Sequence, residues 1–400
     1  MNKSKQKNQQ KDEQQVENTK NLEGQRQTKP QYLNYDALNS ERDKCQEVEF
    51  DNFDDQQVFD WNLQDCRQLL NRPTIREGSS LTYYKDKLYL YGGFSEKLKD
   101  DLFEYDIKKN SWRQVKFDLK QLSIPIESRM GHTANLYGNQ LIIFGGEGQY
   151  NERIKSRNNF NDILLLDLEN FSWSKLHTSV HIIEHRRNHA STIFGNNLFI
   201  IGGVNNSEEY LNNVQAVNLE NGRVKNYEIP QFKKGIAFHT AMACYKKIFN
   251  PAGKKKQHQV KEEGIYIFGG KNQRGKCYND LYVAKLDEKQ KIFEWKMIDI
   301  QDQKPEPRFG HTMNYLSSSN SLIIYGGKDN DGNFYKDFWV FRLYYQKWIK
   351  LDVQGEIERN RHLHCSAIND TNIMYVFGGI DSHKLVSWNL YKVNFQNPLQ

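Results

Sequence analysis

The chain carries the stretch Leu88-Tyr-Leu-Tyr-Gly-Gly93, an apolar run closed by two glycines, and repeats this pattern five more times. The first glycine of each pair follows the previous one by 53, 57, 67, 57 and 52 residues. One supersecondary unit repeated at such a spacing is typical of a repeat architecture. The glycines that we expect to be structural are Gly92, Gly93, Gly145, Gly146, Gly202, Gly203, Gly269, Gly270, Gly326, Gly327, Gly378 and Gly379.

Two further features repeat after each glycine pair. A second apolar run opens with Asp or Asn, as in Asp101-Leu-Phe103 and Asp337-Phe-Trp339. A tryptophan then follows in most units, and Tyr227 stands near this position in the third. The tryptophans of the pattern are Trp112, Trp173, Trp295 and Trp348. Four short strands per unit, rich in β-branched and aromatic residues, predict one propeller blade.

Upstream of each glycine pair, a basic residue enters a strand of small residues, most clearly in Arg129-Met-Gly-His-Thr133. With this element included, the pattern resembles the kelch-repeat family over residues 58–395. The resemblance implies an all-β, six-bladed kelch β-propeller, and we expect a stand-alone one without BTB and BACK regions. Glycine suits the paired positions because it has no Cβ and tolerates positive φ beside a neighbouring strand. Tryptophan supplies a large apolar ring for packing between blades.

The last repeat lacks a tryptophan strand, and the start of the repeat region offers one. Phe59-Asp-Trp61 matches Phe171-Ser-Trp173. We therefore expect residues near 58–63 to form the outer strand of the last blade, with Trp61 as a structural residue. Such pairing would join both ends of the repeat region in one sheet and leave no unfinished blade.

Composition divides the chain in two. Residues 1–50 are dominated by Lys, Gln, Asn and Glu, with only three aromatic residues, so they offer too little apolar surface to offset the entropy of ordering. We predict a disordered, low-complexity tail over 1–50 and the propeller over 51–400. The formal charge of +6 is modest for the length of the chain, so we expect no nucleic-acid partner.

Apolar patterning and cysteine usage limit the compartment and the cofactors. No apolar stretch approaches the roughly 20 residues of a membrane span, and residues 1–30 hold no secretory hydrophobic segment, so we expect a cytoplasmic protein, with cytoskeletal association or the nucleus left open. The five cysteines are scattered without C-x-x-C spacing, which argues against disulfides or a zinc site. We expect no metal and no cofactor.

One equivalent position on the entry strands carries arginine in five of the six units, and Ile236 breaks the series. These register arginines are Arg76, Arg129, Arg186, Arg308 and Arg361. Three residues later stand His132, His189, His239, His311 and His364, with Ser79 in the first unit. Both series could satisfy buried carbonyl and acidic groups between blades. Alternatively, uncompensated guanidinium groups could crowd one channel mouth and bind carboxylates or phosphates.

The resemblance favours the second interpretation most directly for Arg76 and Arg129, because kelch substrate adaptors turn arginines at this position toward an acidic peptide. Loops after the double glycines should rise on the same face. The longest, 147–161, carries Arg153 and Arg157, and the loop 271–279 carries Arg274. A basic face would suit a protein partner with an acidic segment, although these loops could equally be ordinary solvated ones. The insertion 246–263 should be a solvated loop on the opposite face.

Motifs of catalysis were not found. The chain has no P-loop, no G-x-S-x-G and no H-E-x-x-H, and its Tyr, His and Cys residues show no spacing that selects a copper site of the galactose oxidase kind. We expect a non-enzymatic protein-interaction module or scaffold that binds through the loop face and the channel mouth. Two alternatives stay open, a substrate receptor of a ubiquitin ligase and a cytoskeletal or vesicle-traffic scaffold, and an oxidase-type enzyme is less favoured.

Overall fold

The computed structural model describes residues 58–64, 71–117, 124–153, 155–178, 182–245, 262–287, 292–316, 319–354, 360–383 and 389–395. All of them belong to one compact unit, Glu47–Gln400. The predicted tail over 1–50 and residues 246–261 of the insertion lie outside the described residues. The described residues are all-β apart from the short 3-10 turn η1 (Pro230–Phe232), and they include no helix with the length and apolar character needed to cross a membrane.

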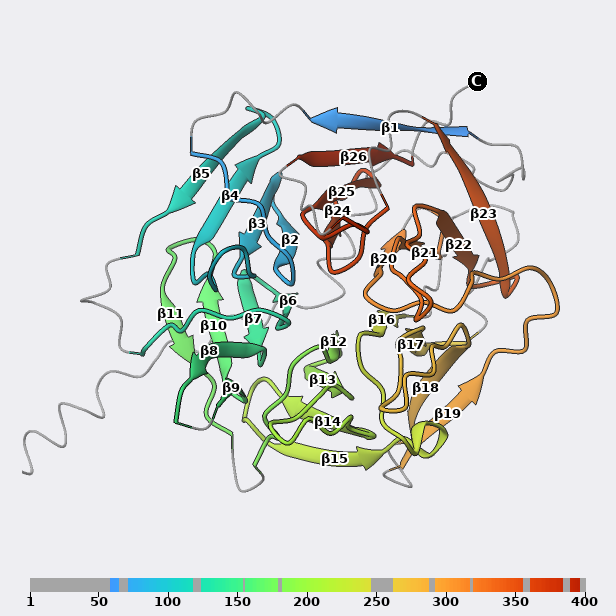
Figure 1. Cartoon of the computed structure of the whole chain (residues 1–400), viewed down its shortest axis with the longest axis horizontal. Coiled ribbons are helices and arrows are strands. Elements are labelled where there is room, and N and C mark those ends of the chain that lie inside the picture. The colour runs from blue at the N-terminus through green and yellow to red at the C-terminus, as the bar shows by residue number, and fades with distance from the viewer. Residues whose placement is uncertain are drawn as a thin grey trace, which may run out of the picture. The chain divides into compact units, whose positions relative to one another are not determined.

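Six four-stranded blades stand around a common centre (Figure 1), as predicted. From the centre outward, blade 1 contains β2 (Ser80–Tyr84), β3 (Lys87–Tyr91), β4 (Leu102–Asp106) and β5 (Ser111–Val115). Blade 2 contains β6 (Thr133–Tyr137), β7 (Gln140–Phe144), β10 (Ile163–Asp167) and β11 (Trp173–Lys175). Blade 3 contains β12 (Ala190–Phe194), β13 (Asn197–Ile201), β14 (Asn213–Asn218) and β15 (Val224–Glu228).

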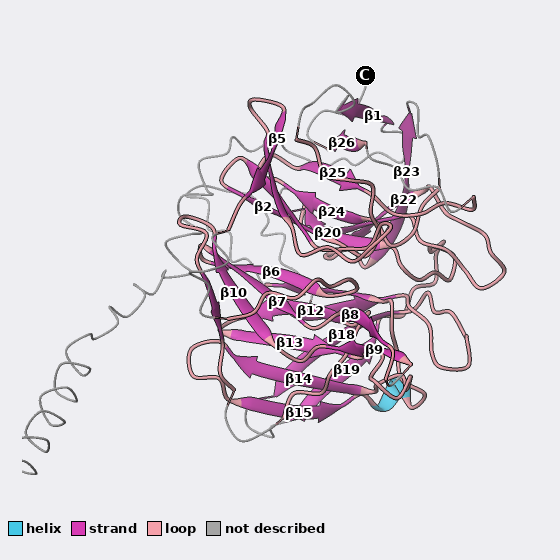
Figure 2. Ribbon diagram, turned by 60° about the vertical axis from the view of Figure 1, so that its left-hand side comes forward, coloured by secondary structure: helices cyan, strands magenta, loops and turns pink. Residues whose placement is uncertain are grey.

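The second half of the ring repeats this arrangement. Blade 4 contains β16 (Thr240–Cys244), β17 (Gly264–Phe268), β18 (Leu281–Asp287) and β19 (Ile292–Met297). Blade 5 contains β20 (Thr312–Leu316), β21 (Ser321–Tyr325), β22 (Phe338–Arg342) and β23 (Lys347–Gln354). Blade 6 contains β24 (Cys365–Ile368), β25 (Ile373–Phe377), β26 (Leu390–Asn394) and β1 (Val58–Gln64). Each innermost strand contacts the innermost strands of both neighbouring blades, and the long loops project to one side of the strands (Figure 2).

The N-terminal strand closes the ring, which confirms the sequence prediction. β1 pairs antiparallel with β26, in a register that places Trp61 opposite Val393. β1 also pairs in parallel with β23 of blade 5, so blades 5 and 6 form one continuous eight-stranded sheet. Phe59 is fully buried, and its ring centroid lies 5.3 Å from that of Phe395. The closure therefore joins three segments that lie far apart in the sequence.

Aromatic rings fill the spaces between blades. Trp112 lies 5.7 Å from Phe377 of blade 6, and Trp348 lies 5.1 Å from Phe268 of blade 4, between ring centroids. Both tryptophans are buried, so each adds a large apolar area to the contact with the preceding blade. Trp173 packs in the same way on blade 1.

The double glycines bring neighbouring blades into backbone contact. Gly92 has φ +64°, and a Cβ there would lie 2.8 Å from the carbonyl oxygen of Arg129 in the next blade. The amide of Gly93 donates to that same oxygen at 2.8 Å. The second glycine of each pair makes the corresponding bond to the next blade, at 2.8 to 3.0 Å. A side chain at the first position would therefore break the approach that this bond requires.

Candidate functional site

A closed ring of backbone hydrogen bonds surrounds the centre of the propeller. Six residues at equivalent positions each donate their amide N–H to the carbonyl oxygen of the equivalent residue in the preceding blade, at 2.8 to 3.0 Å. The six residues are Gly78, Gly131, Asn188, Phe238, Gly310 and Leu363. All have φ between 52° and 66°, which suits glycine and strains the bulky Phe238 and Leu363. We call the opening at this ring the channel mouth.

The register arginines lie beside this ring but are buried within their own blades. Arg129 donates to both carboxylate oxygens of Asp162, at 2.7 and 2.9 Å, and to the carbonyl oxygen of Gly145 at 3.1 Å. Arg308 makes the same contacts with Asp337 and Gly326. In blade 1, Asp101 takes this role. The aspartate that opens the second apolar run is thus the counter-ion of the register arginine.

The expectation of uncompensated, exposed guanidinium groups at the mouth is therefore wrong. The side chains of Arg76, Arg129, Arg186, Arg308 and Arg361 are at most 2% exposed. Buried guanidinium groups cannot contact a partner protein while the ring is intact. Instead, the register arginines connect the start of the innermost strand to the double-glycine turn of the same blade. The repeated aspartates were the sequence signal for this pairing.

Two blades keep the arginine without the aspartate. In blade 3, Arg186 donates to the side-chain oxygens of Asn213 at 3.0 Å and Gln215 at 2.7 Å, and the nearest carboxylate, that of Glu184, lies 3.7 Å away. Burial lowers the pKa of Arg186 to about 10. In blade 6, Asn389 replaces the aspartate, and the Arg361 guanidinium lies 4.8 Å from the ring centroid of Tyr391.

The five histidines link neighbouring inner strands. In four of them Nε2 lies 2.8 to 3.0 Å from a hydroxyl oxygen of the preceding blade, as between His189 and Thr133. His239 has no hydrogen-bond partner among the described residues. Burial lowers the pKa of His132 and of His239 to about 3. The histidines are therefore buried neutral groups between blades, and the partners of four of them are hydroxyl groups instead of the carbonyl and acidic groups that the structural interpretation predicts.

Two positions that the sequence analysis did not single out lie beside this ring of backbone bonds. One directly follows the register arginine, or Ile236 in blade 4, the other directly follows the double glycine, and the two are bridged in every blade. The bridged pairs are Glu77 with Phe94, Met130 with Glu147, Arg187 with Val204, Ala237 with Lys271, Phe309 with Lys328, and His362 with Ile380. The bridges also show that the double-glycine loops rise on the face of the arginine register.

Blades 4 and 5 place two lysines over aromatic rings at this mouth. The Nζ of Lys271 lies 4.3 Å from the ring centroid of Phe309 and 5.1 Å from that of Phe238. The Nζ of Lys328 lies 5.4 Å from Phe309 and 5.3 Å from Phe334. Burial lowers the pKa of Lys271, and the charge of Lys328 lowers it further. Among the described residues, neither ammonium group has a carboxylate within 4.0 Å. We call these two residues the lysine pair.

The predicted loop 147–161 contains a hairpin of its own, β8 (Glu147–Asn151) and β9 (Ser156–Asn159). Arg153 at its tip is exposed, whereas the Arg157 guanidinium lies 5.6 Å from the ring centroid of Phe94 and donates to Gly148. Arg274 is exposed on the loop after Gly270. Exposed cations thus exist on this face, and Arg153 lines a hollow.

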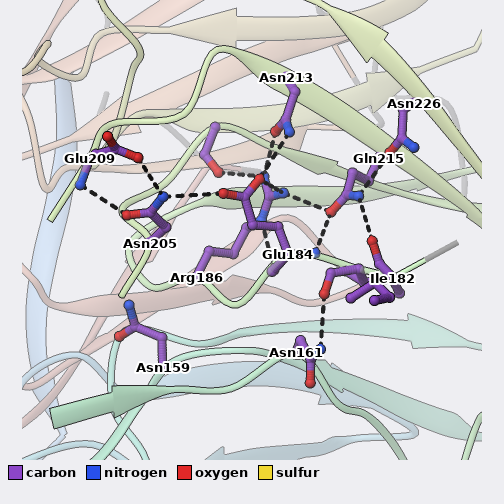
Figure 3. Close-up of polar contacts among 12 residues, drawn as sticks. Asn159, Asn161, Ile182, Glu184, Arg186, Asn205, Glu209, Asn213, Gln215 and Asn226 are labelled. Atoms are coloured by element: carbon purple, nitrogen blue, oxygen red, sulfur yellow. Dashed lines mark hydrogen bonds and ion pairs between the residues drawn. The ribbon is translucent and has the colours of Figure 1, made fainter. Parts of the chain in front are cut away.

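Two hollows of about 500 and 810 Å³ adjoin each other beside this hairpin. They share His185 and Asn206, and nine of their lining residues are Asn or Gln. Figure 3 shows the polar network behind the smaller hollow, centred on Arg186 and Glu184. We call the two hollows together the amide groove.

Among the described residues no three His, Cys, Asp or Glu side chains are grouped as metal ligands. Cys244 and Cys365 are buried free thiols, and burial raises the pKa of both. Cys45 and Cys66 lie outside the described residues.

Comparison with known proteins shows to which family this architecture belongs. The model of the KLHDC2/KLHL20/DRC7 Kelch-repeats domain matches residues 78–261 and 256–398. Protein ral2 of Schizosaccharomyces pombe is 23% identical over 82% of this chain and 61% of its own length. Acyl-CoA-binding domain-containing protein 5 of Arabidopsis thaliana is 24% identical, over 82% of this chain and 48% of its own. Kelch domain-containing protein 3 of Mus musculus is 25% identical over 64% of this chain and 62% of its own.

The chain thus spans about half to three fifths of the length of these curated relatives. A solved structure titled "Structure of YjhT" superposes with a TM-score of 0.59 at 15% identity, covering 80% of this chain and 94% of that one. A structural similarity at 15% sequence identity supports a shared fold and nothing about function.

Proposed function

Since this chain belongs to the Kelch-repeat family, we propose that it is a non-enzymatic protein-interaction module that holds an acidic segment of a partner protein at the channel mouth. A Kelch propeller supports a role in protein interaction. The acidic nature of the segment, and its place beside the lysine pair, are inferred from the charges of the mouth.

The lysine pair carries this proposal. Two like charges on adjacent blades repel each other, and each is half-buried with no carboxylate oxygen of the described residues within 4.0 Å of its ammonium nitrogen, although the charge of Glu77 acts on Lys328 from farther away. A charge whose pKa is perturbed by its surroundings is a mark of a candidate binding site. A carboxylate between Lys271 and Lys328 would remove the repulsion and form charge-assisted hydrogen bonds, which contribute roughly 1.5–3 kcal/mol each.

The aromatic rings support the same proposal in a second way. Phe309 is 6% exposed, and both ammonium groups lie near its ring, at 4.3 and 5.4 Å from the ring centroid. An ammonium group over a ring face is held in place by the ring quadrupole, so the lysine pair is positioned before a partner arrives. A preorganised pair loses less side-chain entropy on binding than two free lysines would.

The test is affinity purification of partners from cell extract with two forms of the full chain, the native one and the double variant Lys271→Gln/Lys328→Gln. We expect the variant to lose partners that the native chain captures, and we expect added salt to weaken the same interactions. The control is Lys108→Gln/Lys109→Gln, which removes two charges from the β4–β5 turn on the opposite face. Retention of every partner by the lysine-pair variant would overturn the proposal.

A further inference from the structure

The amide groove lies between the hairpin β8–β9 of blade 2 and the outer strands of blade 3. Its residues are separate from the lysine pair, which belongs to blades 4 and 5. The groove is elongated, because its two hollows adjoin through His185 and Asn206. Its walls are mostly polar, which distinguishes it from an apolar pocket for a small ligand.

An inner layer of the groove is fixed by hydrogen bonds (Figure 3). Gln215 accepts from Arg186 and from the backbone amide of Glu184, and donates to Asn226 at 2.8 Å. The carboxylate of Glu184 accepts from the side-chain amides of Asn205 at 3.2 Å and Asn213 at 3.3 Å. These amides take the place of the aspartate that neutralises the register arginine in blades 1, 2 and 5. Because blade 3 lacks this aspartate, the floor of the amide groove is a layer of polar side chains that hydrogen bonds hold in place.

Two exposed asparagines stand on this floor as hydrogen-bond donors. The side-chain oxygen of Asn206 accepts from the backbone amide of Asn159 at 2.7 Å, and that of Asn226 accepts from Gln215. Their oxygens are thereby held, and no hydrogen bond within the described residues occupies either Nδ2. Glu184 adds a positioned acceptor nearby. Fixed donors and acceptors on a rigid floor are the features of a binding site.

We propose that the amide groove binds an extended segment of a partner's main chain, an inference that rests on the proposed role in protein interaction. Each peptide unit carries one N–H donor and one C=O acceptor, which matches a row of side-chain amides and a carboxylate. Exposed apolar side chains flank the groove, Ile182 at 83% and Tyr150 at 49% exposure. These give the side chains of the bound segment apolar surface to cover.

The test uses a phage-displayed library of dodecapeptides selected on the full chain, followed by binding measurements on the synthesised peptides. The variant is Asn206→Asp/Asn226→Asp, which keeps both internally bonded oxygens and removes both outward donors. The control is Asn170→Asp/Asn221→Asp, which makes the same change in turns on the opposite face, where each side-chain oxygen likewise accepts a backbone amide. Thermal unfolding of both variants checks that the fold is intact.

We expect the selected peptides to bind the native chain and the control equally, and to bind the groove variant about tenfold more weakly. Methylation of a peptide nitrogen should weaken binding more than replacement of a side chain by alanine. The same peptides should bind Lys271→Gln/Lys328→Gln unchanged, which separates this inference from the proposed function. Equal binding of the peptides to the native chain and to the groove variant would overturn the inference. If the chain bound glycans on a glycan array and selected no peptide, that result would overturn it as well.

Discussion

A single carboxyl group decides how each register arginine is neutralised. Asp162 binds Arg129 through both oxygens inside blade 2, whereas blade 3 offers Arg186 two neutral amides and a carboxylate 3.7 Å away. Both solutions leave the arginine fully buried. The comparison indicates that a blade can bury the guanidinium group with or without an aspartate, because neutral amides take the place of the carboxylate in blade 3.

Replacing Asp162 by Asn tests the role of this pairing. Removing one partner of a buried ion pair leaves an uncompensated charge, so we expect Asp162→Asn to lower the free energy of unfolding by about 3 kcal/mol. Urea unfolding measures the change. The control Asp167→Asn lies at the other end of β10, which Asp162 directly precedes, and among the described residues its side-chain oxygens accept from turn amides and Asn139, so we expect a change below about 0.5 kcal/mol. Equal losses in both variants would contradict an ion-pair role for Asp162.

The arginine pairing shows what residue-level reasoning could reach from the sequence. Arg129 and Asp162 both recur at fixed positions of the repeat, which is the signal that links them, but the exceptions do not covary: Arg186 is matched with Asn213, and Ile236 is matched with Asp280. The mouth positions could not be identified in this way. Residues such as Lys271 and Phe309 differ from blade to blade, so no repeat reveals them before the ring is built.

At the scale of the strand, the closing element was predictable because it repeats a pattern. Phe59-Asp-Trp61 carries the signature of an outer strand, and β1 takes that place in blade 6. Its parallel pairing with β23 was not predicted, since a second partner depends on how two blades approach each other. The hairpin β8–β9 was likewise missed, because its polar sequence resembles a loop and lacks the alternation of a strand.

Deleting the closing strand should destabilise the whole ring. Removal of residues 1–66 exposes the edges of β26 and β23 and the core around Phe395, so we expect loss of a cooperative unfolding transition or a much lower melting temperature. Phe59→Ala in the full chain should cost about 3–5 kcal/mol, because its side chain is fully buried. Removal of residues 1–45, which the composition predicts to contribute little to the core, is the control. Equal melting temperatures for the two deletions would contradict closure by β1.

At the scale of the molecule, the blades are joined by features that repeat six-fold around one centre. Backbone bonds between the ring residues and from the double glycines connect every pair of neighbouring blades, and four of the five buried histidines add a link of their own. None of them is local in sequence, so the ring forms only when all blades are in place. The buried histidines also make the free energy of unfolding depend on pH.

Acid should therefore destabilise the propeller. The folded-state pKa values of His132 and His239 are about 3, and burial holds those of His189, His311 and His364 well below the unfolded value of about 6.5. Below pH 6.5 the unfolded chain binds more protons than the folded one, so the free energy of unfolding falls as the pH drops toward 3. Glu77 and Glu147, whose pKa values burial raises above 4.5, oppose this trend between pH 4.5 and their raised values, where the folded chain binds more protons at these groups than the unfolded one.

His239→Leu isolates one histidine of the series, because neither ring nitrogen of His239 has a partner within the described residues and Ser79 already replaces histidine in blade 1. Each buried neutral histidine steepens the fall in unfolding free energy by about 1.4 kcal/mol per pH unit between roughly pH 4 and 6. We expect the variant to lose one such increment in urea unfolding measured at pH 7.5, 6.0 and 5.0. An unchanged slope would mean that His239 is protonated in the folded ring, and that burial does not set its charge.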